Sequence, residues 1–259
     1  MDILRIEIDG RAARAGELRF PALVNYGHFT MMQVRAQAVR GLDLHLERLD
    51  AATRELFDTG LDGGLVRARI RHALGDDIAD ATVRVIVFQP DPGGRPSVLV
   101  AVRPPAEAPA RPQRLRSVAY QRPVAHIKHT GTFGQIHYGL RAERDGFDDA
   151  LFTSDDGIVS EAGMSNIGGV RGQVITWPDA PMLRGITMQL LERSLPAAGL
   201  RARHGPIRLS GLGSFDAVFL TNSLGVSPAG RVDDRDLPAG PQAVAALAEV
   251  YRSVPWDPI

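Results

Sequence analysis

The residue with the greatest chemical potential in this sequence is Lys128. The chain has 30 lysine and arginine residues, and Lys128 is the only lysine among them. A guanidinium stays protonated in proteins, whereas a buried lysine can lose its proton and become a nucleophile or a Schiff-base partner. A surface lysine without a chemical role is the alternative, so the neighbouring motifs must decide between the two.

Two further charged residues could assist such chemistry. Glu161 lies among small residues in the segment 160–166, and it is either a solvated turn glutamate or a buried acid with a cationic partner. Arg48 lies beside the apolar positions Leu46 and Leu49 of a helical pattern. Its guanidinium could bind a phosphate through two hydrogen bonds, or it could extend to solvent.

Two segments could bind an anion. Residues 183–187 (Leu-Arg-Gly-Ile-Thr) begin a predicted helix after a proline-containing loop, and the N–H groups at a helix N-terminus favour phosphate. Residues 219–225 end an apolar strand with three polar side chains that could also bind an anion. An ordinary helix start and a plain polar turn are the commoner explanations of each segment taken alone.

Composition narrows the class of protein. The 259-residue chain has a formal net charge of zero, which gives no electrostatic case for binding nucleic acid or an anionic membrane. It contains no cysteine, which removes disulfides, thiolate nucleophiles and cysteine-based metal sites, and we expect no metal. No apolar stretch approaches the roughly 20 residues of a membrane span, and the first residues show no signal peptide. We therefore expect a cytoplasmic protein.

Hydrophobic periodicity predicts the elements that must position these groups. The expected strands are 4–8, 29–34, 82–88, 98–102, 115–120, 150–153, 158–159, 166–170, 174–176 and 217–221. The expected helices are 44–57 with Asp43 as N-cap, 65–74, 137–144, 186–195 and 240–251, the last with proline in its first turn. Strands and helices are mixed rather than strictly alternating, which favours an α+β fold over a doubly wound sheet.

A proline-rich segment marks the expected domain boundary. Residues 103–112 contain four prolines in ten residues, which excludes a regular helix or a central strand. We therefore place a linker near 103–114, between a first domain at 1–112 and a second at 115–259. A long edge loop within a single domain is the alternative.

Five short motifs follow one another along the chain, and their order is informative. They are His-Leu-x-Arg-Leu around Arg48, Ile-Lys at Lys128, Glu-x-x-x-x-Asn from Glu161, Leu-x-Gly-Ile-Thr ending at Thr187 and Phe-Leu-Thr-x-Ser ending at Ser223. In this order they resemble the class IV aminotransferase family, the fold type IV pyridoxal phosphate enzymes. The family includes branched-chain and D-amino-acid aminotransferases, R-selective amine transaminases and aminodeoxychorismate lyase. The resemblance covers most of the chain, from about residue 27 to about residue 228.

The resemblance implies a role for each motif. Lys128 matches the lysine that forms a Schiff base with pyridoxal 5'-phosphate and then moves the substrate proton. Glu161 matches the acid that pairs with the pyridine nitrogen. The phosphate-binding group would be Arg48, the Ile186 and Thr187 backbone, Asn222 and Ser223. Family members have a small N-terminal α/β domain and a larger, β-rich C-terminal domain with flanking helices, and they form homodimers.

The subgroup is harder to assign. Branched-chain aminotransferases carry a tyrosine five residues after the lysine and a Phe-Glu-Gly motif, where this chain has Phe133 and Phe29-Thr30-Met31. The Gly-x-Phe-Thr motif ending at Thr30 resembles aminodeoxychorismate lyases, in which a threonine assists elimination of pyruvate. Those lyases usually have Lys-x-x-Asn, and this chain has glycine in place of the asparagine. The chain also departs from the family at Gly168, where an aromatic residue is usual, and at Met188, where a basic one is.

We expect an aminotransferase that moves an amino group from a D-amino acid or an R-amine to a 2-keto acid. Phe29, Met31 and Phe133 would form an apolar wall of the substrate pocket, with Thr30 beside them, and Arg95 is a candidate for binding the substrate carboxylate. The lyase and the branched-chain L-amino acid aminotransferase are the alternatives. A cofactor-free Schiff-base aldolase and an inactive binding protein with the same fold are alternatives from other classes.

Overall fold

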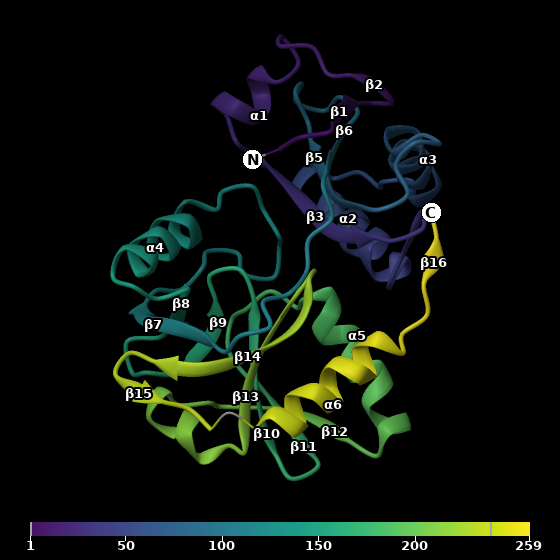
Figure 1. Ribbon diagram of the computed structural model, residues 1–259. Helices are drawn as coiled ribbons and strands as arrows, with labels where there is room; N and C mark the ends of the chain where they lie inside the picture. Colours follow the sequence, from purple (N-terminus) through teal and green to yellow (C-terminus); the bar gives the residue numbers. More distant parts are fainter. Residues whose placement is uncertain (1, 239) are drawn as a thin grey trace. The chain divides into compact units, whose positions relative to one another are not determined.

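The computed structural model describes residues 2–238 and 240–259, and these divide into two compact units. Unit 1 contains the chain up to Ala106 together with Ile127–Gly131 and Pro255–Ile259. Unit 2 contains Glu107–His126 and Thr132–Val254. Each unit has its own mixture of helices and sheet (Figure 1), which confirms the expected α+β class.

Unit 1 is built on a five-stranded antiparallel sheet with strand order β2-β1-β6-β5-β3. The strands are β1 (Arg5–Ile8), β2 (Arg11–Ala12), β3 (Gly27–Val34), β5 (Ala81–Phe88) and β6 (Ser97–Arg103), and β4 (Ala38–Val39) pairs separately with β16 (Asp257–Pro258). The helices are α1 (Arg19–Leu23), α2 (Leu42–Phe57) and α3 (Gly63–Leu74). The apolar side chains of α2 and α3 bury one face of this sheet and form the core of the unit.

Strand β3 sets the geometry of unit 1, because its side chains alternate between the two faces of the sheet. Met32 and Val34 belong to the core formed with α2 and α3. His28 and Thr30 have the same parity and face the helices too, whereas Phe29 and Met31 face the opposite side. The register is fixed by eight successive pairs with β5, from Gly27–Phe88 to Val34–Ala81.

Unit 2 contains a nine-stranded sheet: eight strands follow the order β12-β11-β10-β13-β14-β7-β8-β9, and the ninth, β15, pairs with β14. The strands are β7 (Gln113–Ala119), β8 (Asp149–Thr153), β9 (Val159–Ala162), β10 (Asn166–Arg171), β11 (Val174–Pro178), β12 (Arg201–Gly205), β13 (Ala217–Asn222), β14 (Gly225–Val232) and β15 (Arg235–Asp236). The helices are α4 (Phe133–Arg144), α5 (Ile186–Ser194) and α6 (Pro241–Arg252), with short 3-10 turns η1 (Leu195–Ala198) and η2 (Leu209–Ser214). Side chains of α5 and α6 pack with β10, β11 and β13 around Trp177 and Phe219.

Several sequence expectations need correction. Helix α2 begins at Leu42 with Gly41 as its N-cap, so Asp43 lies within the first turn instead of capping it. Helix α4 begins at Phe133, four residues before the predicted start at His137. Two segments that the sequence placed after the linker pack with unit 1, because the Phe29 N–H donates to the Lys128 carbonyl at 2.8 Å and the Ile259 N–H donates to the Gln37 carbonyl at 3.1 Å.

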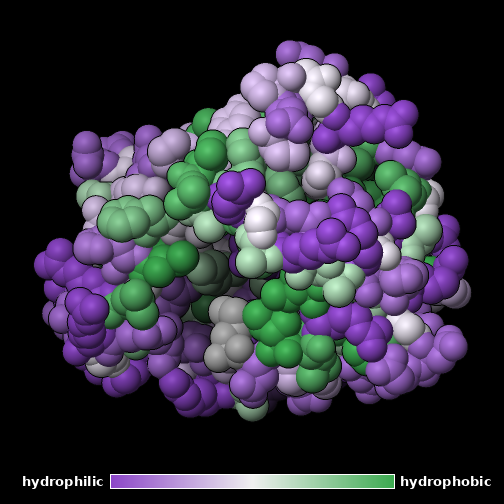
Figure 2. Space-filling view, turned by 90° about the horizontal axis from the view of Figure 1, so that it is seen from above, coloured by the Kyte–Doolittle hydropathy of each residue, from purple (hydrophilic) through white to green (hydrophobic). Residues whose placement is uncertain are grey.

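The face drawn in Figure 2 is largely hydrophilic, with hydrophobic side chains gathered in separate groups. Within the part of the chain that the structure describes, no helix combines the length and the apolar character needed to cross a bilayer. The same residues contain no cluster of three or more histidine, aspartate or glutamate side chains arranged to hold a metal ion.

Candidate active site

Lys128 is held in unit 1 by backbone hydrogen bonds to β3. The Phe29 N–H donates to the Lys128 carbonyl and the Thr130 N–H donates to the Gly27 carbonyl, both at 2.8 Å. These bonds fix the lysine backbone beside Phe29, and the Lys128 Nζ atom lies 4.9 Å from the centre of the Phe29 ring. The lysine side chain is half-buried. It therefore lies against the Phe29 ring, at a place fixed by strand β3.

Two neutral histidines fill the interface between β3 and α2. His45 Nδ1 lies 2.6 Å from Thr30 Oγ1, and His28 Nε2 lies 2.9 Å from Thr53 Oγ1. Burial lowers the pKa of His28 to about 4. Burial, assisted by the positive charges of Arg48 and Lys128, lowers the pKa of His45 to about 3. The side chains of Arg48 and Lys128 are therefore both close enough to His45 to affect its protonation.

The predicted pocket residues of unit 1 do not share one environment. Phe29 is buried under both Lys128 and the guanidinium of Arg84, whose central carbon is 3.9 Å from the ring centre. Thr30 is fully buried, and its hydroxyl forms a hydrogen bond with His45. Met31 is half-buried and lies opposite Arg84 in the sheet, whereas Arg95 is exposed in the loop between β5 and β6.

Arg84 is a candidate that the sequence analysis missed. Its Nε atom is buried and has no hydrogen-bond partner, and Arg84 forms no ion pair with a carboxylate among the described residues. Burial, and then the charge of Arg103, lowers the pKa of Arg84. A partly buried arginine without an acid is costly unless something anionic binds it. Its position as the one charged residue in the otherwise largely apolar run 82–88 is the feature of the sequence that could have identified Arg84.

Glu161 lies in unit 2 on β9 and is 6% exposed, which excludes a solvated turn glutamate. Its Oε2 atom accepts a hydrogen bond from the Leu183 N–H at 3.2 Å. Arg122 is also buried, and although burial lowers the pKa of Arg122, the negative charge of Glu161 opposes that shift. Glu161 is therefore a buried acid with a cationic neighbour, suited to a ligand with a positive charge.

The two predicted anion segments of unit 2 meet. Ile186 and Thr187 are the first residues of α5, and the Thr187 hydroxyl donates to the Asn222 carbonyl at 2.6 Å. The Asn222 side chain donates to Ser165 Oγ at 3.0 Å, and Ser223 follows in the turn between β13 and β14. The start of α5 therefore lies against this turn, and N–H groups in the first turn of a helix are the kind of donor that can hold an anion.

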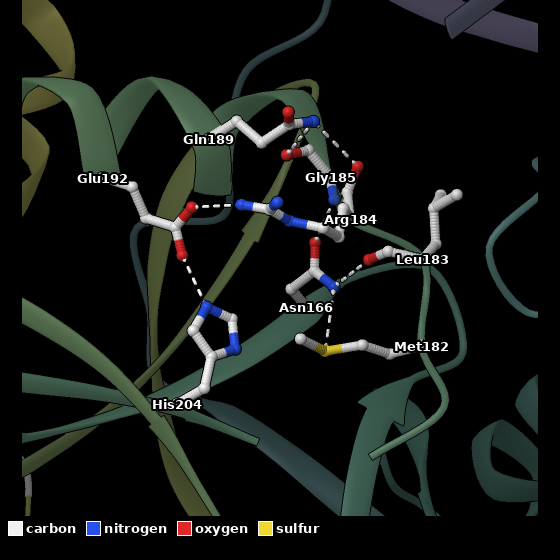
Figure 3. Close-up of polar contacts among 8 residues, drawn as sticks. All are labelled: Asn166, Met182, Leu183, Arg184, Gly185, Gln189, Glu192 and His204. Carbon is white, nitrogen blue, oxygen red and sulfur yellow. Dashed lines mark hydrogen bonds and ion pairs between the residues drawn. The ribbon is translucent and has the colours of Figure 1, made fainter. Parts of the chain in front are cut away.

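Figure 3 shows how the loop before α5 is held. Asn166 donates to the Leu183 carbonyl at 2.6 Å and accepts from the Gly185 N–H at 3.0 Å. On the outer side, the Arg184 guanidinium contacts Glu192 at 2.6 Å, and Glu192 also contacts His204 at 2.9 Å. By contrast, Phe133 is 80% exposed at the start of α4, where its ring stacks on His137.

Comparison with known proteins identifies the family. The sequence model of the family described as amino-transferase class IV matches residues 27–232. The match covers most of the 259 residues, and this chain therefore belongs to the class IV aminotransferase family. It is an enzyme of that family, with pyridoxal 5'-phosphate as its cofactor. The donor set fits this cofactor, because the chain offers a single lysine side chain, a buried acid and a helix N-terminus able to hold a phosphate.

Solved structures share the fold. A branched-chain aminotransferase from the thermophilic archaeon Thermoproteus uzoniensis with norvaline is 22% identical, with 97% of this chain and 94% of that chain covered and a TM-score of 0.85. A PLP-bound hypothetical aminotransferase from Mycobacterium tuberculosis is 22% identical, covering 96% and 98%, with a TM-score of 0.83. A putative 4-amino-4-deoxychorismate lyase from Legionella pneumophila subsp. pneumophila str. Philadelphia 1 is 20% identical, covering 91% and 93%, with a TM-score of 0.82. No curated protein sequence matches the chain significantly.

Proposed function

We propose that this enzyme is an aminotransferase that moves an amino group from a D-amino acid or an R-amine to a 2-keto acid. Bound pyridoxal phosphate supplies an aldehyde and an electron-accepting ring. Lys128 would hold this aldehyde through its amine, and the same amine would accept and return the substrate proton. Its half-buried place against Phe29, beside neutral His45, supports this role.

The remaining roles follow from charge and burial. Glu161, a buried carboxylate, keeps the pyridine nitrogen protonated. The phosphate is bound by Arg48, the N–H groups of Ile186 and Thr187, Asn222 and Ser223. The contact between Thr187 and Asn222 supports the grouping of the last four residues. We further propose that the enzyme works as a homodimer.

The observation that carries the choice of reaction is the position of Thr30. Elimination of pyruvate would use a threonine hydroxyl near the substrate. Here the Thr30 side chain is fully buried on the α2 side of β3, with its hydroxyl 2.6 Å from His45 Nδ1. On the Lys128 side of the strand, Phe29 and Met31 offer no hydroxyl group. Transamination needs no such group, and it is therefore favoured over the lyase reaction.

Arg84 is our candidate for binding the substrate carboxylate, in preference to Arg95. Arg84 lies on the same face of the sheet as Phe29 and Met31, and its guanidinium is stacked on the Phe29 ring. Its buried Nε atom has no hydrogen-bond partner among the residues that the structure describes, whereas Arg95 is exposed in a loop. An anionic substrate group would supply the missing partner.

A half-reaction experiment tests the proposal. The loaded enzyme is mixed separately with D-alanine, R-1-phenylethylamine and L-leucine, and the visible spectrum is followed for conversion to the pyridoxamine form. Conversion by D-alanine or the R-amine, reversed by a 2-keto acid, is the expected result. Conversion by L-leucine alone would favour the branched-chain alternative. Pyruvate release from aminodeoxychorismate without any pyridoxamine form would establish the lyase.

A further inference from the structure

The Asn166 side chain binds the backbone on both sides of Arg184, in the loop before α5. Asn166 is the first residue of β10 and is 4% exposed. Its Nδ2 atom donates to the Leu183 carbonyl at 2.6 Å, and its Oδ1 atom accepts from the Gly185 N–H at 3.0 Å. Figure 3 shows the amide inserted against the loop that leads into α5. Because the amide both donates and accepts, this arrangement satisfies two backbone groups at once.

Position 185 needs glycine because of its contact with Asn166, and its backbone conformation does not demand glycine. Its dihedral angles, φ −63° and ψ 147°, lie in a region that any residue adopts. A Cβ atom at this position would nevertheless overlap Asn166 Oδ1, far inside the 3.0 Å limit that real Cβ atoms respect. Outside Asn166, the nearest atom would be Met188 Cβ at an ordinary 3.9 Å. The glycine of Leu-x-Gly-Ile-Thr therefore makes room for the asparagine of Glu-x-x-x-x-Asn.

Leu183 links this contact to the buried acid. Its N–H donates to Glu161 Oε2 at 3.2 Å, while its carbonyl accepts from Asn166. Gly185 then leads directly into Ile186, the first residue of α5. A continuous set of hydrogen bonds therefore runs from Glu161 through Leu183 and Asn166 to the N-terminus of α5.

We propose that Asn166 is a positioning residue that couples Glu161 to the first turn of α5, and that Gly185 provides the space this coupling needs. The inference rests on the proposed function, in which Glu161 binds the pyridine nitrogen and the α5 N-terminus binds the phosphate. The two groups that hold opposite ends of the cofactor then form one rigid unit. Binding at either end is strengthened because the other end is already in place.

The test measures binding to the cofactor-free enzyme and the spectrum of the loaded one. Asn166→Ala leaves the Leu183 carbonyl and the Gly185 N–H without their partner. Asn166→Asp keeps the acceptor for the Gly185 N–H, but it sets a carboxylate oxygen against the Leu183 carbonyl and adds a buried negative charge. We expect Asn166→Ala to weaken pyridoxal phosphate binding by about tenfold or more, the usual effect of losing a buried hydrogen-bond partner. We also expect it to shift the pH midpoint of the bound cofactor's absorbance, because Glu161 moves.

Gln189→Ala is the matched control. Gln189 also donates to carbonyls of this loop, to Arg184 at 3.1 Å and to Gly185 at 3.5 Å, but from the exposed side and without a link to Glu161. The affinity of this variant for the cofactor should stay within about twofold of wild type, less than one exposed hydrogen bond is worth. An equal loss in Gln189→Ala and Asn166→Ala would mean that any loosening of the loop suffices, and the coupling would be wrong.

Two double variants distinguish coupling from general loss of structure. Asn166→Ala should weaken binding much less when Glu161→Gln is already present, and effects that multiply independently would overturn the proposal. Gly185→Ala should harm binding in the wild-type background but add little to Asn166→Ala, because the clashing oxygen is gone. If Gly185→Ala is equally harmful in both, the glycine serves another purpose and the inference fails. If the wild-type enzyme binds no pyridoxal phosphate, the site assignment itself falls and this inference falls with it.

Discussion

The buried histidines of unit 1 predict a specific loss of stability in mild acid. His28 and His45 have folded-state pKa values of about 4 and about 3, against 6.5 for an exposed histidine, in both cases chiefly because of burial. The unfolded chain therefore binds protons at a higher pH than the folded chain does. The stability contributed by the neutral rings is present above pH 6.5 and is lost as the pH falls below it.

The magnitude follows from the number of protons. For each histidine the slope is about 0.7 kcal/mol per pH unit at pH 6.5, where the unfolded ring is half protonated, and it approaches about 1.4 kcal/mol per unit near pH 5. Between about pH 6.5 and about pH 5 both folded rings stay largely neutral, and the free energy of unfolding should fall by about 3 kcal/mol from these two groups. That loss is comparable to a large part of the stability of an ordinary domain.

Urea unfolding at a series of pH values measures this slope. In His45→Gln the mean slope between about pH 6.5 and about pH 5 should fall by about 1 kcal/mol per pH unit, whatever the variant's stability at neutral pH. His137→Gln is the control, because that ring is exposed on α4, and it should leave the slope unchanged. The reasoning is wrong if His45→Gln and wild type lose stability in parallel.

Three further predictions concern single residues. Lys128→Ala and Lys128→Arg should both abolish turnover and the visible band of lysine-bound cofactor, because neither side chain offers a primary amine. Arg84→Met should raise KM for D-alanine by about tenfold and leave KM for R-1-phenylethylamine within about twofold, since only the amino acid carries a carboxylate. Burial raises the pKa of Asp149 from 3.8 to about 6, so its folded form binds a proton more readily and stability is lost as the pH rises through this interval. Asp149→Asn should remove that loss in urea unfolding measured at about pH 4.5 and about pH 7.5.

Strands with a clear apolar pattern could be predicted from the sequence. Strands without such a pattern, which form only because they pair with neighbouring strands, could not. The runs that became β5 and β6 alternate or are continuously apolar, and both were expected. Strand β14 contains Gly225, Gly230 and Pro228, residues that disfavour strands, and it forms because it lies between β13 and β7. Strand β12 is almost entirely exposed and carries no apolar period. Tertiary pairing overrides local preference in both.

The candidate site also has a part that the sequence predicts and a part that only the structure shows. Motifs predicted Lys128, Glu161 and the α5 N-terminus as candidates, because residue type and local order are visible in a sequence. Burial of Glu161 and the isolation of Arg84 depend on packing between distant segments, and no local pattern shows them. The departure at Gly168 is likewise a packing effect. A Cβ atom there would lie 2.6 Å from the Phe219 ring and 3.0 Å from Trp177, so the space for a side chain is already filled.

The parity of β3 links the fold to the choice of reaction. Consecutive side chains of a strand point to opposite faces, so a motif that reads Phe-Thr-Met cannot present all three residues to one ligand. The core formed by Met32 and Val34 with α2 and α3 fixes which parity is inward, and that assigns Thr30 to His45. A slip of one residue would turn Thr30 toward Lys128, but it would also expose Met32 and Val34 to the other face. Packing of the hydrophobic core thus determines that no hydroxyl of this strand faces the lysine.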